Sequence, residues 1–318
     1  MPSGKDLEQR NILLNRLVKR DRHLRKLARR DDTDCYRVYD RDIPEVPISV
    51  DRYGDVAVVY LYERPYEKPD QEEAEWLSLM RVATAEALGL DPESVLCKTR
   101  RRLGIDEQYD RTDNTQLFRV VREQGLRFKV NVSDYLDTGL FMDHRPTRAM
   151  VRGMAQGRRV LNLFCYTGSF SVYALAGGAA EVWGVDLSNT YLAWAEENID
   201  LNGLGQARYH SVRADAARFL AEAKSSGERY GLIILDPPTF SNSKKMDEFM
   251  DLHRHWPALV QSCLAILDTG GDLLFSTNSR GLKFDPSLVK AASVMDISAE
   301  STPEDFRHKP HRAWIIRT

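Results

Sequence analysis

The chain has 318 residues and 42% hydrophobic side chains, so it is long enough for two domains and apolar enough to bury a core. Its formal net charge of −2 does not by itself indicate a nucleic-acid partner. No apolar run approaches the roughly 18 residues needed to cross a bilayer, and the scattered cysteines lack metal-type spacing. We therefore expect a cytoplasmic protein with no membrane anchor and no metal site.

The first 30 residues predict a basic amphipathic helix. Leucines recur mostly at three- and four-residue steps from residue 7 to residue 29, with Arg and Lys between them. Basic residues outnumber acidic ones here, which favours contact with an RNA backbone, although a solvated face is the alternative. The RNA-binding candidates on this helix are Arg25, Lys26, Arg29 and Arg30.

Residues 1–130 are expected to form a small α+β RNA-docking domain. Two β-type runs within 36–62 flank the turn YGD and predict a hairpin, and residues 72–88 return to helical periodicity. Further strands are expected at 95–102, 117–123 and 126–132, around a polar loop at 104–114. A second basic run contributes the RNA-binding candidates Lys98, Arg100, Arg101 and Arg102.

Residues 131–318 alternate strand and helix at regular spacing, which is typical of a doubly wound α/β domain. The expected strands are 159–164, 181–186, 207–215, 231–236 and 271–277, and the expected helices are 169–176, 190–201, 216–224 and 246–267. In such a sheet ligands bind where the parallel strands end. Functional residues are therefore expected at these carboxyl ends.

The first of these strands leads into a turn that suits S-adenosylmethionine. The sequence LNLFCYTGSFSVYALAGGA supplies Thr167 and a single glycine, Gly168, whereas a dinucleotide site needs several glycines around its pyrophosphate. Asp186 closes the next strand, where a carboxylate can accept ribose hydroxyls, and Asp215 closes the third, beside the adenine. A plain tight turn and helix-capping aspartates are the alternatives. The neighbouring candidates for cofactor binding are Phe164, Tyr166, Leu187 and Ala216.

A dense polar segment, NVSDYLDTGLFMDHRPTR, precedes the α/β domain. Arg145 could pair with the methionine carboxylate, and Phe141 could lie against the adenine or the sulfonium. An interdomain network of salt bridges is the alternative, above all for His144 and Arg148. The cofactor-binding candidates in this segment are Thr138, Gly139, Phe141, Asp143 and Arg145.

The fourth strand ends in DPPTF, which predicts the reaction centre. Pro237 and Pro238 hold the chain extended beside the Asp236 carboxylate, which can also border the cofactor, and Phe240 can stack on a flat base. A rigid strand exit with Phe240 in the core is the alternative. A base within a helix cannot reach such a pocket, so it must be unpaired or flipped out.

The same residues favour nitrogen methylation over carbon methylation. Methylation at cytosine C5 needs a cysteine nucleophile near the site, and neither DPPTF nor the later run FSTNS contains one. Guanine N7 needs only to be oriented, whereas an exocyclic amine needs acceptors for its protons, and the motif by itself fits the amine slightly better. A catalytically silent RNA-binding assembly factor is the rival from another class.

The chain resembles, over nearly its whole length, the C-terminal guanine-N7 methyltransferase domain of the bifunctional bacterial 23S rRNA methyltransferases. The runs that carry the resemblance are NRLVKRDRHLRKLARR, CYRVYDRDIPE, VDRYGD, DYLDTGLFMDHR, LNLFCYTGS, VDLSNTYLAWAEENIDLNGL and DPPTFSNSK. The resemblance implies a Rossmann-like class I methyltransferase fold, S-adenosylmethionine as donor, and 23S rRNA or a large-subunit assembly intermediate as partner. It tips the choice of nitrogen toward N7.

The family's usual protein carries an RNA-binding module and a guanine-N2 methyltransferase domain ahead of this one. We therefore expect this chain to find its RNA alone, with a heavier role for the two basic runs. A related family of cytosine-5 enzymes shares the central motifs but normally has the cysteine that is missing here.

Overall fold

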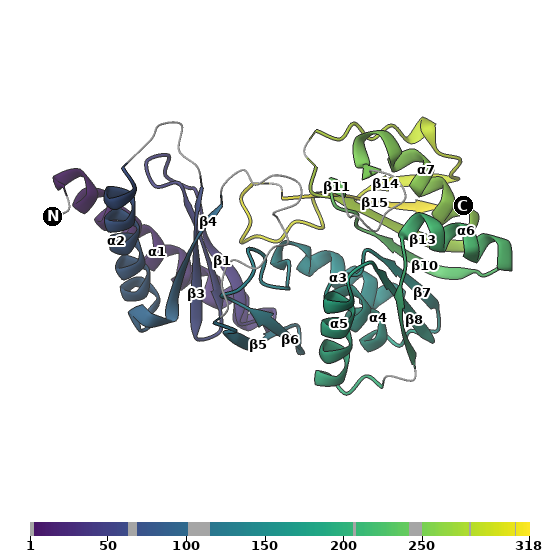
Figure 1. The fold of residues 1–318 in the computed structure, drawn as a ribbon, viewed down its shortest axis with the longest axis horizontal. Coiled ribbons are helices and arrows are strands. Elements are labelled where there is room, and N and C mark those ends of the chain that lie inside the picture. The colour runs from purple at the N-terminus through teal and green to yellow at the C-terminus, as the bar shows by residue number, and fades with distance from the viewer. Residues whose placement is uncertain are drawn as a thin grey trace. The chain divides into compact units, whose positions relative to one another are not determined.

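The computed structural model describes residues 3–62, 69–100, 115–205, 208–241, 250–279, 281–308 and 310–318. The chain forms two compact units (Figure 1). The first contains Met1–Thr138 and the returning segment Glu304–His308, and the second contains Gly139–Pro303 and Lys309–Thr318. Within the described residues, no helix is long and apolar enough to cross a membrane. The boundary between the units lies at residue 138, later than the boundary at 130 expected from the sequence. The difference arises because the loop that follows β6 belongs to the first unit.

The first unit is an α+β unit built on a four-stranded sheet of order β1-β2-β3-β4, in which β4 alone runs parallel to its neighbour. Its elements are α1 (Gly4–Arg30), β1 (Cys35–Asp40), β2 (Ile48–Tyr53), β3 (Val56–Tyr62), α2 (Asp70–Leu88), β4 (Val95–Arg100), and the hairpin of β5 (Phe118–Glu123) and β6 (Leu126–Asn131).

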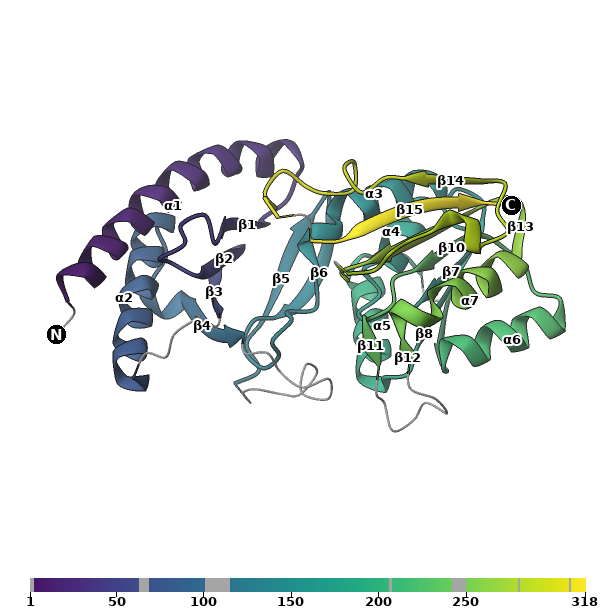
Figure 2. The same ribbon diagram turned by 90° about the horizontal axis from the view of Figure 1, so that it is seen from above.

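Helix α1 forms and packs for local reasons. Ser3 caps it by accepting a hydrogen bond from the backbone N–H of Asp6, whose carboxylate accepts one from the backbone of Ser3 in return. Leu13, Leu17 and Leu24 are buried along one side, against α2 and one face of the sheet (Figure 2). Each buried leucine contributes about 1.5–3 kcal/mol relative to exposure. The exposed side of α1 carries basic residues, among them Lys19, Arg22, Lys26 and Arg29.

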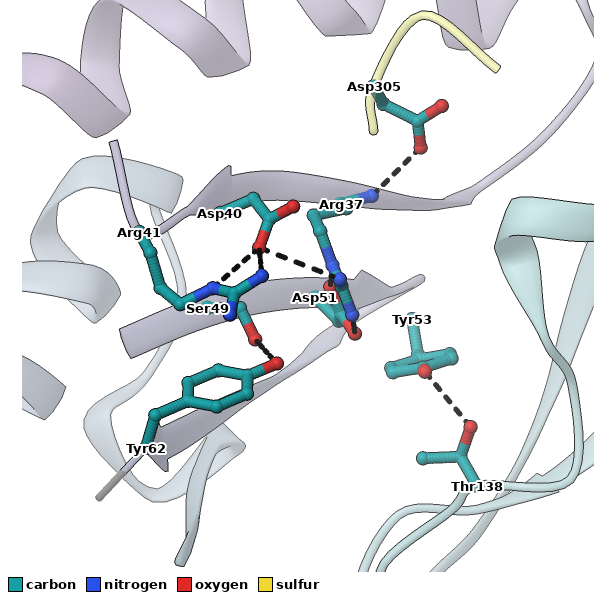
Figure 3. Close-up of polar contacts among 9 residues, drawn as sticks. All are labelled: Arg37, Asp40, Arg41, Ser49, Asp51, Tyr53, Tyr62, Thr138 and Asp305. Carbon is teal, nitrogen blue, oxygen red and sulfur yellow. Dashed lines mark hydrogen bonds and ion pairs between the residues drawn. The ribbon is translucent and has the colours of Figure 1, made fainter. Parts of the chain in front are cut away.

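The other face of this sheet carries a buried polar network (Figure 3). The Arg37 guanidinium donates two hydrogen bonds to Asp51, of 2.7 and 2.9 Å. The returning segment joins this network: the backbone N–H of Arg37 donates to Asp305 at 3.0 Å, and the guanidinium carbon lies 4.4 Å from the centre of the Phe306 ring. Residues far apart in the sequence therefore complete one unit.

The second unit has a seven-stranded sheet of order β14-β15-β13-β10-β7-β8-β9. Its elements are α3 (Arg145–Met154), β7 (Arg159–Leu163), α4 (Ser169–Ala176), β8 (Glu181–Asp186), α5 (Asn189–Leu201), β9 (Tyr209–Arg213), α6 (Ala216–Ser226), β10 (Tyr230–Leu235), the small hairpin of β11 (Phe240–Ser241) and β12 (Met250–Asp251), α7 (Leu252–Ala265), β13 (Leu267–Thr277), β14 (Ser293–Asp296) and β15 (Arg312–Arg317).

Five strands of this sheet form a parallel group: β7, β8, β9, β10 and β13. Strand β15 pairs antiparallel with β13. The strand order reverses between β7 and β10, and ligands bind in α/β sheets at such a reversal. The doubly wound α/β fold expected from the sequence is confirmed. The five expected parallel strands are all present, and β14 and β15, which had not been located from the sequence, complete the seven strands that the resemblance implies.

The largest differences from the expected bounds in the second unit are at α7 and β13. Helix α7 begins at Leu252 and ends at Ala265, and β13 begins at Leu267, where a longer helix and a later strand were expected. Asp251 caps the helix by accepting a hydrogen bond from the backbone N–H of His253, so the helix has a local start signal. An apolar run shared by a helix end and a strand start does not show where one gives way to the other.

Candidate functional site

The turn after β7 has an unusual backbone. Phe164 and Tyr166 have φ values of 56° and 50°, which L-residues rarely adopt, and Gly168 follows at 72°. A Cβ atom added to Gly168 would lie 2.6 Å from the Cβ of Ala195 in α5. Helix α5 therefore packs closely on this turn, and glycine is required there for both reasons. Backbone strain of this kind tends to concentrate at ligand sites.

Asp186, at the end of β8, connects three strand ends. Its carboxylate accepts hydrogen bonds from the backbone N–H groups of Tyr166 (3.1 Å) and Ser188 (2.9 Å), and its carbonyl accepts one from Ala214 (3.2 Å). Burial raises the pKa of the Asp186 carboxyl above its ordinary value, and the backbone donors oppose that rise. Each carboxylate oxygen has a second lone pair, so the group can still accept ribose hydroxyls. Leu187 follows it, half-buried.

Asp215 caps helix α6, as in the helix-capping alternative to its expected role beside the adenine. Its Oδ1 accepts a hydrogen bond of 3.0 Å from the backbone N–H of Arg218. A cap uses one lone pair of one oxygen, so the capping role and contact with an adenine amino group are compatible. Ala216, the next residue, is buried.

Aromatic rings gather beside the turn. The Phe141 side chain is 42% exposed, and its ring centre lies 5.4 Å from that of Tyr166. The ring of Tyr191, from α5, meets Tyr166 edge-on at 4.6 Å. An exposed aromatic face next to a strained turn is suited to a flat or cationic ligand group.

Residues 139–145 connect the turn after β7 to the end of β10. The hydroxyl of Thr167 donates to the carbonyl of Gly139, and a Cβ atom on Gly139 would lie 2.6 Å from the Trp194 ring. At the other end of the segment, His144 approaches Asp236. Arg145 is buried at the first residue of α3.

Two polar side chains of this segment, His144 and Arg148, have partners within the second unit. Arg148 is fully buried and donates to the carbonyl of Phe141 at 2.9 Å, and His144 contacts Asp236, all within the second unit. Thr138, by contrast, belongs to the first unit, where its hydroxyl donates to that of Tyr53 (Figure 3). We therefore leave Thr138 out of the candidate site.

Asp236 follows β10 and has one polar neighbour at each carboxylate oxygen. Ser276, on β13, donates to Oδ1 at 2.7 Å, and Nε2 of His144 lies 3.5 Å from Oδ2. Pro237 is buried and Pro238 is half-buried. Phe240 begins the short strand β11, and its side chain lies outside the described part of the structure.

His144 and His311 form a buried stack. Their ring centres are 4.0 Å apart with planes inclined by 16°. His311 lies within hydrogen-bond distance of Asp143 through Nδ1 (3.1 Å) and of Ser301 through Nε2 (3.0 Å). Nitrogen lone pairs lie in the ring planes, so stacked rings do not direct them at one point between them. Although Asp143, His144 and His311 are close together, they are not arranged to share one metal ion.

The cysteines are not placed to act as nucleophiles. Burial raises the pKa of Cys165, in the turn after β7, well above its ordinary value, and does the same to Cys263 inside α7. A thiol nucleophile needs the thiolate form. A covalent route through C5 of cytosine has no support among these side chains.

The basic candidates separate into two groups. Arg25 is paired with Asp21 at 2.6 Å and Arg30 with Asp31 at 2.7 Å, whereas Lys26 and Arg29 have no acidic partner among the described residues. Lys98 is half-buried and donates to the carbonyl of Tyr135, and its RNA-binding role stays a prediction. The side chain of Arg100, and Arg101 and Arg102 entirely, lie outside the described residues.

Sequence reasoning missed the residues that support the site. Ser276 lies on β13 within the run FSTNS, whereas His311 directly precedes β15 and carries no local motif that connects it to Asp236. Asn198, in α5, donates to the carbonyl of Thr167 at 2.9 Å. Only the run FSTNS, with its cluster of polar residues at a strand end, offered a usable signal.

Comparison with known proteins gives a consistent result. A family model described as S-adenosylmethionine-dependent methyltransferase matches residues 39–297. The ribosomal RNA large subunit methyltransferase K of Neisseria meningitidis serogroup B is 45% identical over 304 residues, which are 95% of this chain and 86% of that protein. The ribosomal RNA large subunit methyltransferase K/L of Shewanella loihica is 40% identical over 99% of this chain but only 44% of its own length. The chain thus spans less than half of the K/L relatives.

Solved structures show the same fold. SMU.776, crystallised with SAH, matches 97% of this chain and 82% of its own with a TM-score of 0.76 at 21% identity. A SAM-dependent methyltransferase from Agrobacterium tumefaciens matches 73% of this chain and 70% of its own with a TM-score of 0.55 at 25% identity.

Proposed function

Because the chain belongs to the S-adenosylmethionine-dependent methyltransferases, in the family of the large-subunit ribosomal RNA methyltransferase K, we propose that it methylates N7 of a guanine in 23S rRNA. A ribosomal RNA substrate is met in the cytoplasm, and that compartment is part of the proposal. The observation that carries the choice of a nitrogen is Asp236, a carboxylate fixed by two partners at the end of β10, with no available thiolate beside it.

The residues around the β7 turn fit the cofactor of this family. S-adenosylmethionine supplies an electrophilic methyl group on a sulfonium. Asp186 accepts the ribose hydroxyls, Phe141 and Tyr166 face the adenine or the sulfonium, and Arg145 is the candidate partner of the methionine carboxylate. Asp215 and the neighbouring backbone border the adenine.

Asp236 orients the guanine in this proposal. As a carboxylate it accepts hydrogen bonds only, so it grips the N1 and N2 protons of the base and leaves the N7 edge free. Guanine N7 carries an in-plane lone pair and loses no proton on methylation, so no general base is needed. Orientation at contact distance is then the main task of the protein. The rigid prolines keep the carboxylate and the loop carbonyls in fixed directions.

The RNA backbone contacts α1 in this proposal. Lys19, Arg22, Lys26 and Arg29 follow one another at steps of three, four and three residues, so they lie along one side of the helix over about 15 Å. We call these four residues the α1 stripe. All four are exposed, and none has an acidic partner among the residues that the structure describes. Such cations bind phosphates without giving up an existing ion pair. The stripe keeps Lys26 and Arg29 of the expected set and adds two residues.

Mass spectrometry of nuclease-digested rRNA from a strain lacking this chain tests the proposal. We expect 7-methylguanosine to be reduced in 23S rRNA and to return when the purified protein acts on that RNA. Loss of N2-methylguanosine or N6-methyladenosine instead would favour amine methylation, and loss of 5-methylcytidine would favour the cytosine enzymes. Supplying free 23S rRNA and large-subunit precursors in parallel shows which form is the substrate.

A further inference from the structure

His144 occupies a place that the proposed reaction does not yet use. Its side chain is buried, and Nε2 lies 3.5 Å from Oδ2 of Asp236, on the carboxylate oxygen that Ser276 does not contact. This distance is long for a hydrogen bond, and catalytic hydrogen bonds often shorten when the substrate is bound. Each oxygen of Asp236 therefore has one potential donor beside it.

The imidazole of His144 is itself held in place. One face stacks on His311 at 4.0 Å, and the ring of Phe170, from α4, meets it edge-on at 5.6 Å. His311 is in turn fixed at both nitrogens by Asp143 and Ser301. A ring packed in this way cannot rotate without disturbing a second, hydrogen-bonded ring.

The protonation state follows from the surroundings. Burial lowers the pKa of His144, and the nearby charges work in both directions: Asp236 and Asp143 raise it, whereas His311 and Arg148 lower it. Nδ1 is buried and has no hydrogen-bond partner among the described residues. A protonated ring would leave a buried N–H there without an acceptor, which is costly. The neutral tautomer with its proton on Nε2 fits, which places the proton on the ring nitrogen nearest Asp236.

We propose that His144 is a positioning residue that fixes the Asp236 carboxylate through Nε2–H, with His311 holding the imidazole in turn. The inference rests on the proposed function, because it assigns Asp236 the task of orienting the base. A carboxylate with one oxygen loose can rotate about its Cβ–Cγ bond. With both oxygens held, its free lone pairs keep one direction, and a misplacement of about 1 Å in such a group can cost about 100-fold in rate. His144 acts on the reaction through Asp236 and touches no substrate atom in this assignment.

The test compares two substitutions of His144. Phe in place of His144 keeps the stacking on His311 and removes the donor, whereas His144→Gln keeps an N–H donor near the position of Nε2. We expect His144→Phe to lower kcat about 100-fold, with the affinity for S-adenosylmethionine, measured by calorimetry, within a few-fold of wild type. We expect His144→Gln to restore kcat to within about tenfold of wild type, the size of one imperfect hydrogen bond.

Equal losses in the two variants, or wild-type turnover in His144→Phe, would overturn the proposal. If His144→Phe fails to fold, as judged by circular dichroism, the proposal is tested by comparing kcat of His144→Gln with kcat of Ser276→Ala. Ser276→Ala frees the other oxygen of Asp236, so it should lower kcat with unchanged cofactor affinity, and a His144→Gln variant less active than Ser276→Ala would contradict the assignment. Methyl incorporation into total rRNA is the readout. Wild-type protein that transfers no methyl group refutes the proposed function, whereas the ratios among variants test His144 alone.

Discussion

The α1 stripe can be tested against a control of equal charge. The test variant carries both Arg22→Ala and Lys26→Ala, which removes two unpaired cations. The control variant carries both Arg25→Ala and Arg30→Ala, which removes two paired cations. Both double variants lose the same net charge from the same helix, and all four side chains are exposed. Any difference between them reflects which cations contact phosphate.

The expected size follows from counterion release. Each phosphate contact contributes about 0.7 (single strand) to 0.9 (duplex) to the slope of log K against log[salt], so losing two contacts should flatten the slope by about 1.4 to 1.8. At 0.1 M salt this corresponds to roughly 25- to 60-fold weaker binding. The control should change the slope much less, because each of its arginines already has an acidic neighbour.

Fluorescence anisotropy with a labelled 23S rRNA fragment, from about 0.05 to 0.3 M salt, measures both quantities. Equal slopes for wild type and the Arg22/Lys26 variant would refute the footprint on α1. Equal flattening in both double variants would instead indicate a diffuse basic field rather than a stripe.

Three further predictions concern the second unit. Asp236→Ala should abolish methyl transfer to rRNA while calorimetry shows cofactor affinity within a few-fold, and normal turnover would exclude its role. Cys165→Ala should keep methyl transfer, since burial holds its thiol protonated; complete loss in a folded variant would reopen a thiolate mechanism. Because burial lowers the pKa of His144, the unfolded state binds its proton first, so stability should fall as pH drops below about 6.5, by at most about 1.4 kcal/mol per unit from this group. Urea midpoints at pH 7.5 and 5.5 should therefore differ more in wild type than in His144→Gln, and an equal difference would argue against a buried neutral ring.

Local signals predicted the parts of the fold that depend on local chemistry. The strand at 181–186 and the helix at 169–176 have the expected bounds, because a glycine turn or a closing aspartate marks where each stops. The strand ends that carry Asp186, Asp215 and Asp236 follow in the same way, since the carboxyl ends of parallel strands meet at one edge of the sheet.

What the sequence could not show is which distant residues meet. Ser276 donates to Asp236 because β13 pairs with β10, and His311, which directly precedes β15, reaches His144 because β15 pairs with β13. The difference between Arg25 and Lys26 could have been read from the sequence, because Arg25 follows Asp21 by four residues and Lys26 does not.

The returning segment Glu304–His308 has a consequence for synthesis. Asp305 and Phe306 complete the surroundings of Arg37 in the first unit, yet the ribosome makes them after nearly all of the second unit. Domains fold as units during translation, starting from the N-terminus. The first unit must therefore wait, with the Arg37 amide lacking its final acceptor, until the last stretch of polypeptide emerges. A fragment that stops at Thr138 should accordingly exchange that amide proton with solvent faster than the full chain does.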